Sequence, residues 1–202
     1  PLIYPSSREY IKFYWRVINL RRKLAGPNKY FENPISEEKY IYMPLHLIPE
    51  STTFVKAPLY TNELNIIEAV SKTLPIGWKL YVKEHQAMLG ERGVEFYEAV
   101  KKLPNVRLVQ YNYYKDPKPW IANALGVITI TGTAAYEAAL LGKKAIIFGD
   151  VPFSVIDRVK RIHSFEELIE SWQWIVKEDT SDRSCAAFIK TVKNVGAPIR
   201  YK

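Results

Sequence analysis

A threonine-glycine-threonine turn is the segment of this 202-residue chain whose residue types point most clearly to chemistry. Thr131, Gly132 and Thr133 follow an apolar run and precede a run of small residues that contains Glu137. Backbone N–H groups, hydroxyls and the positive end of a helix would meet at such a turn, which favours a bound phosphate. Glu137, one turn further along, is placed to accept hydrogen bonds from a ribose diol. On spacing alone, an ordinary capped helix explains these residues equally well.

Two histidines and their neighbours follow other predicted strands. Lys83 and His85 flank Glu84 where a strand ends, so strand alternation turns Lys83 and His85 to one side and Glu84 to the other. A lysine and a histidine on one side suit phosphate oxygens, and a solvated loop is the alternative for both. His46 and Glu50 come at the end of the first predicted strand, and their role is open.

Motifs of several other function classes are absent from the sequence. It has no GxGxxG or GxxxxGK[ST] loop, which argues against simple NAD-binding and P-loop proteins. It has neither a D-x-D pair nor a HExxH or Cys/His ligand set, so we expect no metal and no cofactor. No G-x-S-x-G elbow indicates a serine hydrolase. Protein groups would then neutralise the phosphate of a bound nucleotide.

Strand and helix patterns alternate from residue 39 onward. Strands are predicted at 39–46, 78–83, 106–109, 126–130 and 144–148, and helices at 60–73, 91–102, 120–124, 133–141, 164–174 and 181–195. Near-continuous apolar strands that alternate with helices predict an α/β fold, a Rossmann-like doubly wound parallel sheet of about five strands with C-terminal helices. Ligands of such sheets gather outside the carboxyl ends of the strands, where the residues above fall.

The first 38 residues are predicted to form an N-terminal helical arm and linker (1–38) ahead of the domain (39–202). Apolar residues over 8–24 recur at the spacing of one helical stripe: Ile11, Tyr14, Trp15 and Ile18. Ser6 or Ser7 can cap this helix, and Gly26-Pro27 ends it. The same stretch holds six basic residues and one acid.

The composition indicates an ordinary globular protein, with 48% hydrophobic and 25% charged residues. The net charge of +8 is spread as +3 over 1–38, +3 over 39–156 and +2 over 157–202, so it does not indicate a nucleic-acid partner. A lone Cys185 excludes an internal disulfide framework. No apolar run approaches the roughly 20 residues that span a bilayer, and no secretory signal is visible, so we expect a cytoplasmic protein. The start at Pro1 suggests a piece of a longer chain.

Aromatic residues are concentrated in two other places. The segment 110–120 carries Tyr111, Tyr113, Tyr114, Lys115 and Lys118. Such a segment can stack nucleic-acid bases, but no RNA-binding motif accompanies it, which favours an aromatic loop beside a ligand cleft or against a neighbouring domain. Trp172 and Trp174 are predicted to be packing anchors on a C-terminal helix.

Three separated strings resemble, in the right order, the capsule polysaccharide biosynthesis family of bacterial glycosyltransferases. They are PLHLIPESTT, LPIGWKLYVKEHQAMLGER and VITITGTAAYEAALLGKKAIIFGD, and the resemblance covers about residues 39–153. It implies the C-terminal, donor-binding lobe of a two-lobed GT-B enzyme; characterised members of the family transfer Kdo from CMP-Kdo. It further implies that His85 and Thr131 to Thr133 hold the donor phosphate, that Glu137 holds the ribose, and that His46 and Glu50 lie at the cleft. Where the family usually has His-Pro, this chain has His85-Gln86, which weakens the role of His85.

The implied activity is metal-independent transfer from a sugar nucleotide to a glycan or glycolipid acceptor. The acceptor lobe does not fit within this chain, and no catalytic base or nucleophile is identified. One alternative is a noncatalytic scaffold whose basic helix docks on a membrane-bound capsule complex, peripheral to the inner membrane. For the helix itself, packing against the missing lobe as a brace is favoured over membrane docking. Another is a sugar-nucleotide epimerase of similar fold, with Glu50, Glu84 and Asp150 as its acidic candidates.

Overall fold

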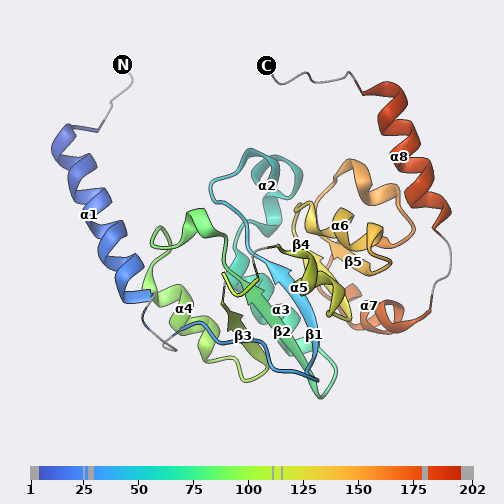
Figure 1. Cartoon of the computed structure of the whole chain (residues 1–202), viewed down its shortest axis with the longest axis horizontal. Coiled ribbons are helices and arrows are strands. Elements are labelled where there is room, and N and C mark those ends of the chain that lie inside the picture. The colour runs from blue at the N-terminus through green and yellow to red at the C-terminus, as the bar shows by residue number, and fades with distance from the viewer. Residues whose placement is uncertain are drawn as a thin grey trace.

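Six parallel strands form one sheet in the order β3-β2-β1-β4-β5-β6 (Figure 1). The structure, a computed structural model, describes residues 5–24, 26, 30–110, 112–114, 116–178 and 182–196. The strands are β1 (Lys39–Pro44), β2 (Trp78–Lys83), β3 (Val106–Val109), β4 (Gly126–Thr129), β5 (Lys144–Ile147) and β6 (Val159–Arg161). The predicted doubly wound parallel sheet is confirmed. β6 adds a strand to the predicted five because only one of its three residues is buried, so it leaves no apolar run.

Helices cover both faces of this sheet. They are α1 (Ser7–Leu24), α2 (Ser51–Lys56), α3 (Glu63–Thr73), α4 (Val94–Lys101), α5 (Lys118–Ala122), α6 (Ala134–Leu140), α7 (Glu167–Val176) and α8 (Arg183–Val195). One core cluster joins the sheet to α3, α4 and α7, and a second joins it to α5, α6 and α8. The helix predicted over 60–73 begins only at Glu63, because the Asn62 side chain accepts hydrogen bonds from the amides of Leu64 and Asn65 and caps α3 there.

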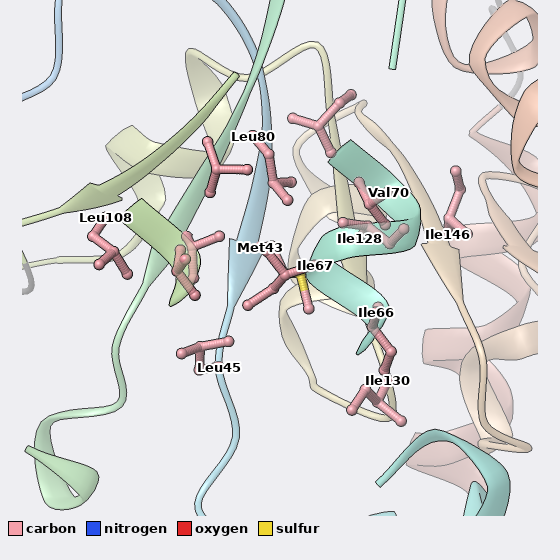
Figure 2. Packing of buried hydrophobic residues seen from close by; sticks show 14 of the residues in the cluster. Met43, Leu45, Ile66, Ile67, Val70, Leu80, Leu108, Ile128, Ile130 and Ile146 are labelled. Carbon is pink, nitrogen blue, oxygen red and sulfur yellow. The ribbon is translucent and has the colours of Figure 1, made fainter. Parts of the chain in front are cut away.

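The first core cluster is built from branched aliphatic side chains of the central strands and α3 (Figure 2). Its central members are Met43, Ile66, Ile67, Val70, Leu80 and Ile128, all 0 or 1% exposed. The buried stripe of α3 therefore runs through Ile66, Ile67 and Val70. This packing fixes α3 across β1, and with it the loop at the end of β1.

Small and aromatic residues make the second face. Ala135, Ala138 and Ala139 of α6 are fully buried, and their short side chains let α6 lie close to β4 and β5. On the β1 side of this face, the Tyr40 and Tyr81 rings are stacked at 4.0 Å. The close approach of α6 determines where the preceding turn meets the end of the sheet.

The N-terminal arm is a helix, as predicted, but its apolar stripe does not face the domain. Ser6 and Glu9 form a reciprocal cap, in which the Ser6 amide donates to Glu9 at 2.6 Å and the Glu9 amide donates to the Ser6 hydroxyl at 3.4 Å. Val17 and Leu24 are the buried residues of α1. The predicted linker also packs on the domain, because Tyr30 and Phe31 enter the first core cluster.

The boundary near residue 38 stays a prediction. Some residues of the sequence analysis, namely Pro1, Pro27, Tyr111, Lys115 and Ser181, lie outside the described residues.

Replacing Ile128 by alanine tests the first core cluster. Ile128 is 0% exposed at the centre of the sheet, so Ile128→Ala should lower the free energy of unfolding by about 3 kcal/mol through lost burial and a residual cavity. Urea unfolding followed by circular dichroism measures this. Ile76→Ala is the matched control, because Ile76 lies fully exposed before β2 and should change stability by less than about 0.5 kcal/mol. Equal effects of the two substitutions would contradict the assigned core.

Candidate functional site

The order of the strands reverses between β1 and β4, and a hollow of about 370 Å³ lies at their carboxyl ends. Ligands of open α/β sheets bind at such a switch point. Six of the eight predicted site residues line this switch-point hollow: His46, Glu50, His85, Thr131, Gly132 and Thr133. His46 and Thr131, for example, are 85 residues apart in the sequence, and folding brings them to the same hollow.

A second hollow, of about 300 Å³, adjoins the first and holds Lys83. The two share Pro44, Leu45 and His85, and Tyr114 closes the second one. Burial lowers the pKa of Lys83, and the neighbouring Glu84 carboxylate opposes this only in part. A bound anion would therefore stabilise the charged form of Lys83.

His46 is buried at the floor of the switch-point hollow and is held in one tautomer. Its Nε2 lies 3.3 Å from the Thr131 amide nitrogen and 3.2 Å from the Thr129 hydroxyl. A backbone N–H can only donate, so Nε2 must accept and the proton must sit on Nδ1. Nδ1 then donates to Glu63 Oε1 at 3.1 Å. His46 is therefore a structural link between β1 and the turn after β4, and its ring nitrogens are occupied.

An ionic network lies beneath His46. Arg92 pairs with Glu63, pairs with Glu84 at 3.0 Å and donates to the backbone carbonyl of His46 at 2.8 Å. The Tyr97 hydroxyl donates to Glu84 at 2.8 Å. Burial raises the pKa of Glu84, and the positive charge of Arg92 offsets this rise only in part. Glu84 does not line the switch-point hollow, but it borders the second one beside Lys83, where its carboxylate is held by this network.

Two glycines allow the turn after β4 to lie against its neighbours. A Cβ atom on Gly132 would come within 2.6 Å of the Thr129 hydroxyl, and one on Gly149 would come within 2.4 Å of the Thr131 methyl group. The Thr131 hydroxyl also contacts the Thr53 hydroxyl at 3.2 Å. Thr131 is thus engaged through both its amide and its hydroxyl, whereas Thr133 is exposed at the rim of the hollow.

His85 offers one ring nitrogen to the hollow. Its Nδ1 accepts a hydrogen bond from the Ala87 amide at 3.3 Å and caps the short 3-10 helix Gln86–Met88. The neutral ring then carries its proton on Nε2, which makes no hydrogen bond within the described part of the chain. The short helix that begins at Gln86 thus orients His85; the family that the sequence resembles usually has a proline at the position of Gln86.

Glu137 and Glu50 differ in their relation to the hollow. Glu137 does not line it; its carboxylate accepts a hydrogen bond from the Thr133 hydroxyl at 3.4 Å. Glu50 precedes α2, makes no side-chain cap there, and lines the hollow. Among the acidic candidates for an epimerase, Asp150 pairs with Arg161 at 3.2 Å outside both hollows, and Glu84 is buried in its network.

Two features of the surroundings bear on other ligands. Tyr113 and Tyr114 pack on Trp120, with ring centroids 6.1 and 4.8 Å away, which matches an aromatic loop beside the cleft. Trp172 is buried against Trp78, as a packing anchor would be. Within the described ranges, no three His, Cys, Asp or Glu side chains form a group that could hold a metal ion.

Sequence reasoning missed three residues that shape the site: Glu63, Arg92 and Thr129. Glu63 gives a signal in retrospect, because it stands in phase with Ile66, Ile67 and Val70 and so carries a carboxylate on the buried face of α3. Arg92 lies in a polar turn and gives none.

Comparisons with known proteins find likeness in structure alone. No family model matches the sequence, and no curated protein sequence matches it. The Thermosulfurimonas dismutans KpsC β-Kdo 2,7-transferase has a TM-score of 0.50 at 17% identity, over 82% of this chain and 53% of that one. The UDP-GlcNAc 2-epimerase of Methanocaldococcus jannaschii has a TM-score of 0.56 at 16% identity, over 88% and 49%. The same epimerase in complex with UDP-GlcNAc and UDP has a TM-score of 0.52 at 14% identity, over 88% and 52%.

These likenesses show the fold alone, an α/β arrangement shared with a glycosyltransferase and with UDP-GlcNAc 2-epimerases. The chain spans about half the length of the solved structures that it matches. Both a glycosyltransferase and an epimerase are among them, so the fold does not choose between the two reactions.

Removing Arg92 tests the network under the site. Arg92→Leu leaves the Glu63 and Glu84 carboxylates buried without their cation, and should lower the free energy of unfolding by about 3–5 kcal/mol. The loss should be smaller at low pH: burial already raises the pKa of Glu84, and protonation of a group with a raised pKa favours the folded state as pH falls. Urea unfolding at ~pH 5 and ~pH 8 measures both effects.

Arg22→Leu is the control for this experiment, because Arg22 is exposed on α1. An Arg92 variant as stable as the Arg22 variant, or one whose loss of stability does not depend on pH, would contradict the network.

Proposed function

We propose that this chain is the donor-binding lobe of a metal-independent GT-B glycosyltransferase. Its donor would be CMP-Kdo or a related sugar nucleotide. The observation that carries the proposal is the switch-point hollow. His46, Glu50, His85 and the turn 131–133 line it together at the carboxyl edge of the sheet. These are the residues in which the sequence resembles the capsule polysaccharide biosynthesis family.

The donor phosphate is the part of the substrate that this site suits best. His85 Nε2–H and Lys83 border the same edge and are donors to phosphate oxygens. Thr133 adds a hydroxyl at the rim. When the glycosidic bond to the phosphate breaks, these donors would stabilise the negative charge of the departing nucleotide. No metal ion is needed for that charge in this mechanism.

The remaining roles follow from the resemblance. Glu137, on the first turn after Thr133, holds the ribose, and reaches it if its hydrogen bond to Thr133 gives way. His46 acts from below by holding the turn, since both its ring nitrogens are occupied. A glycan or glycolipid acceptor and the acceptor lobe complete the enzyme, and no residue is assigned as the catalytic base or nucleophile. Such an acceptor places the cytoplasmic protein at the inner membrane.

An epimerase of the same fold is the second candidate, since one of the structures above is a UDP-GlcNAc 2-epimerase. It would need free acidic groups in the cleft. Glu50 lines the switch-point hollow, whereas Glu84, which borders the second hollow, is engaged by Arg92 and Tyr97. This favours the transferase. A noncatalytic scaffold would keep the sheet but would have no need of His85 or Lys83 at the hollow.

Calorimetric titration with CMP, UDP and GDP tests the donor site. One of them should bind, and His85→Ala should weaken it about tenfold, as expected for a lost hydrogen bond to a charged group. Glu137→Ala should weaken it as well. His163→Ala is the matched control, because His163 is exposed after β6 and lines neither hollow. No binding of any nucleotide, or unchanged binding in the His85 and Glu137 variants, would overturn the assignment.

The pH dependence of nucleotide affinity tests the role of Lys83. Burial lowers the pKa of Lys83, so its positive charge is lost at a lower pH than that of an exposed lysine. The phosphate is fully ionised above ~pH 7.5, so affinity should fall as pH rises from there toward ~pH 10. Lys83→Arg should keep its affinity over this range, because arginine stays charged. A parallel fall in the wild-type and arginine proteins would exclude Lys83 as the titrating group.

A further inference from the structure

Helix α1 carries its apolar residues on a surface that no described part of the chain covers. Ile11 and Trp15 are each 70% exposed and Tyr14 is 59% exposed, although such residues normally enter a core. Every residue from Ser7 to Arg16 is exposed, so the first turns project from the domain (Figure 1). At 1.5 Å per residue, this free part is about 15 Å long.

The other end of α1 is fixed. Arg21 Nε donates to the Leu89 carbonyl at 2.6 Å, and Leu24 is fully buried in the first core cluster. Gly90, at a φ of 87°, lies so close to α1 that a Cβ atom there would be 2.7 Å from the Val17 carbonyl oxygen. The exposed face is therefore held in place by a packed base, and is not a frayed terminus.

The exposed side chains divide by kind around the helix axis. At 100° per residue, an apolar arc of about 200° holds Tyr10, Ile11, Phe13, Tyr14, Trp15 and Ile18. The opposite arc holds Arg8, Lys12 and Arg16, together with Glu9, so the division holds over residues 8–18; Arg21 and Arg22, in the last turn, fall on the side of the apolar arc. Glu9 is the one acid of the helix, and it is bound to Ser6 in the cap.

We propose that α1 is an interfacial anchor that lies in the surface of an anionic lipid bilayer. A broad aromatic and aliphatic face with a basic opposite face is what a bilayer interface binds, since the rings enter the headgroup region and the cations meet anionic lipid. No described helix is long and apolar enough to cross a membrane. The charge of the helix selects the occupant: a protein surface disfavours lysine, whereas an anionic bilayer gains from each basic residue.

The position of α1 gives this anchor a use. Its free end lies on the same side of the molecule as α2, which follows the carboxyl end of β1 (Figure 1). In Figure 1 α1 runs up one flank of the molecule, so a bilayer that holds α1 in its plane would lie along that flank. Docking by α1 does not depend on the donor-binding function; where both hold, the donor site would be kept close to a membrane that carries a lipid-borne acceptor.

Sedimentation with phospholipid vesicles tests the anchor. The 202-residue chain should pellet with vesicles that contain phosphatidylglycerol, pellet much less with pure phosphatidylcholine vesicles, and lose binding as salt is added. Trp15→Glu and Ile11→Glu should each lower the partition coefficient at least tenfold. Lys12→Gln should lower it about fivefold, which corresponds to the contribution of one basic residue at an anionic surface.

Matched controls separate docking from general stickiness. Ile76→Glu makes the same change at a fully exposed site away from α1, and Lys102→Gln removes an exposed lysine of α4's C-terminal end; neither should alter partitioning. Failure of the wild-type chain to pellet with anionic vesicles, or equal partitioning of the α1 and control variants, would overturn the proposal. So would self-association that Trp15→Glu abolishes, with no vesicle binding, because a second protein surface would then cover this face.

Discussion

One guanidinium joins two buried carboxylates, and the floor of the site depends on it. Glu63 comes from α3 and Glu84 from the end of β2, and burying either charge alone would cost several kcal/mol. Arg92 pairs with both and also donates to the carbonyl of His46, so β2, α3 and the loop after β1 meet at one side chain. The carboxyl edge of the sheet is therefore set before any ligand arrives.

The hydrogen bonds of His46 carry this order across the sheet. Glu63 holds the proton on Nδ1, and the opposite nitrogen accepts from the Thr131 amide, on the far side of the switch point. Because Gly132 and Gly149 have no side chains, the turn after β4 can lie close against its neighbours. The buried polar groups of the site thus form hydrogen bonds within the protein. The donors left for a ligand are the exposed His85 and Thr133 and the half-buried Lys83, which the rigid edge holds in position.

The sequence predicted the sheet, its covering helices and the edge at which the site lies, because apolar runs and their spacing report burial directly. It did not predict the short strand β6, whose residues are mostly half-buried. It also placed Thr131 as a phosphate ligand from its type alone, and its buried partners follow only from folding. Glu63 could be predicted, because it lies in phase with the buried residues of α3. Arg92 could not, because the sequence of an exposed turn does not differ from that of a turn whose arginine forms a buried ion pair. The stripe on α1 was visible, but not that the domain leaves it uncovered.

The size of the hollow connects these features. The switch-point hollow of about 370 Å³ is at the lower end of the range for small-molecule sites, and it adjoins a second hollow of about 300 Å³. The walls described here come from three strand ends of one sheet, and the chain spans half the length of the structures it matches. Under the proposed function, phosphate and nucleoside recognition would reside in this chain, while selection of the sugar and acceptor would require a second wall. A site that recognises the constant part of its substrate and leaves the variable part to its surroundings needs a rigid edge, which the buried network supplies.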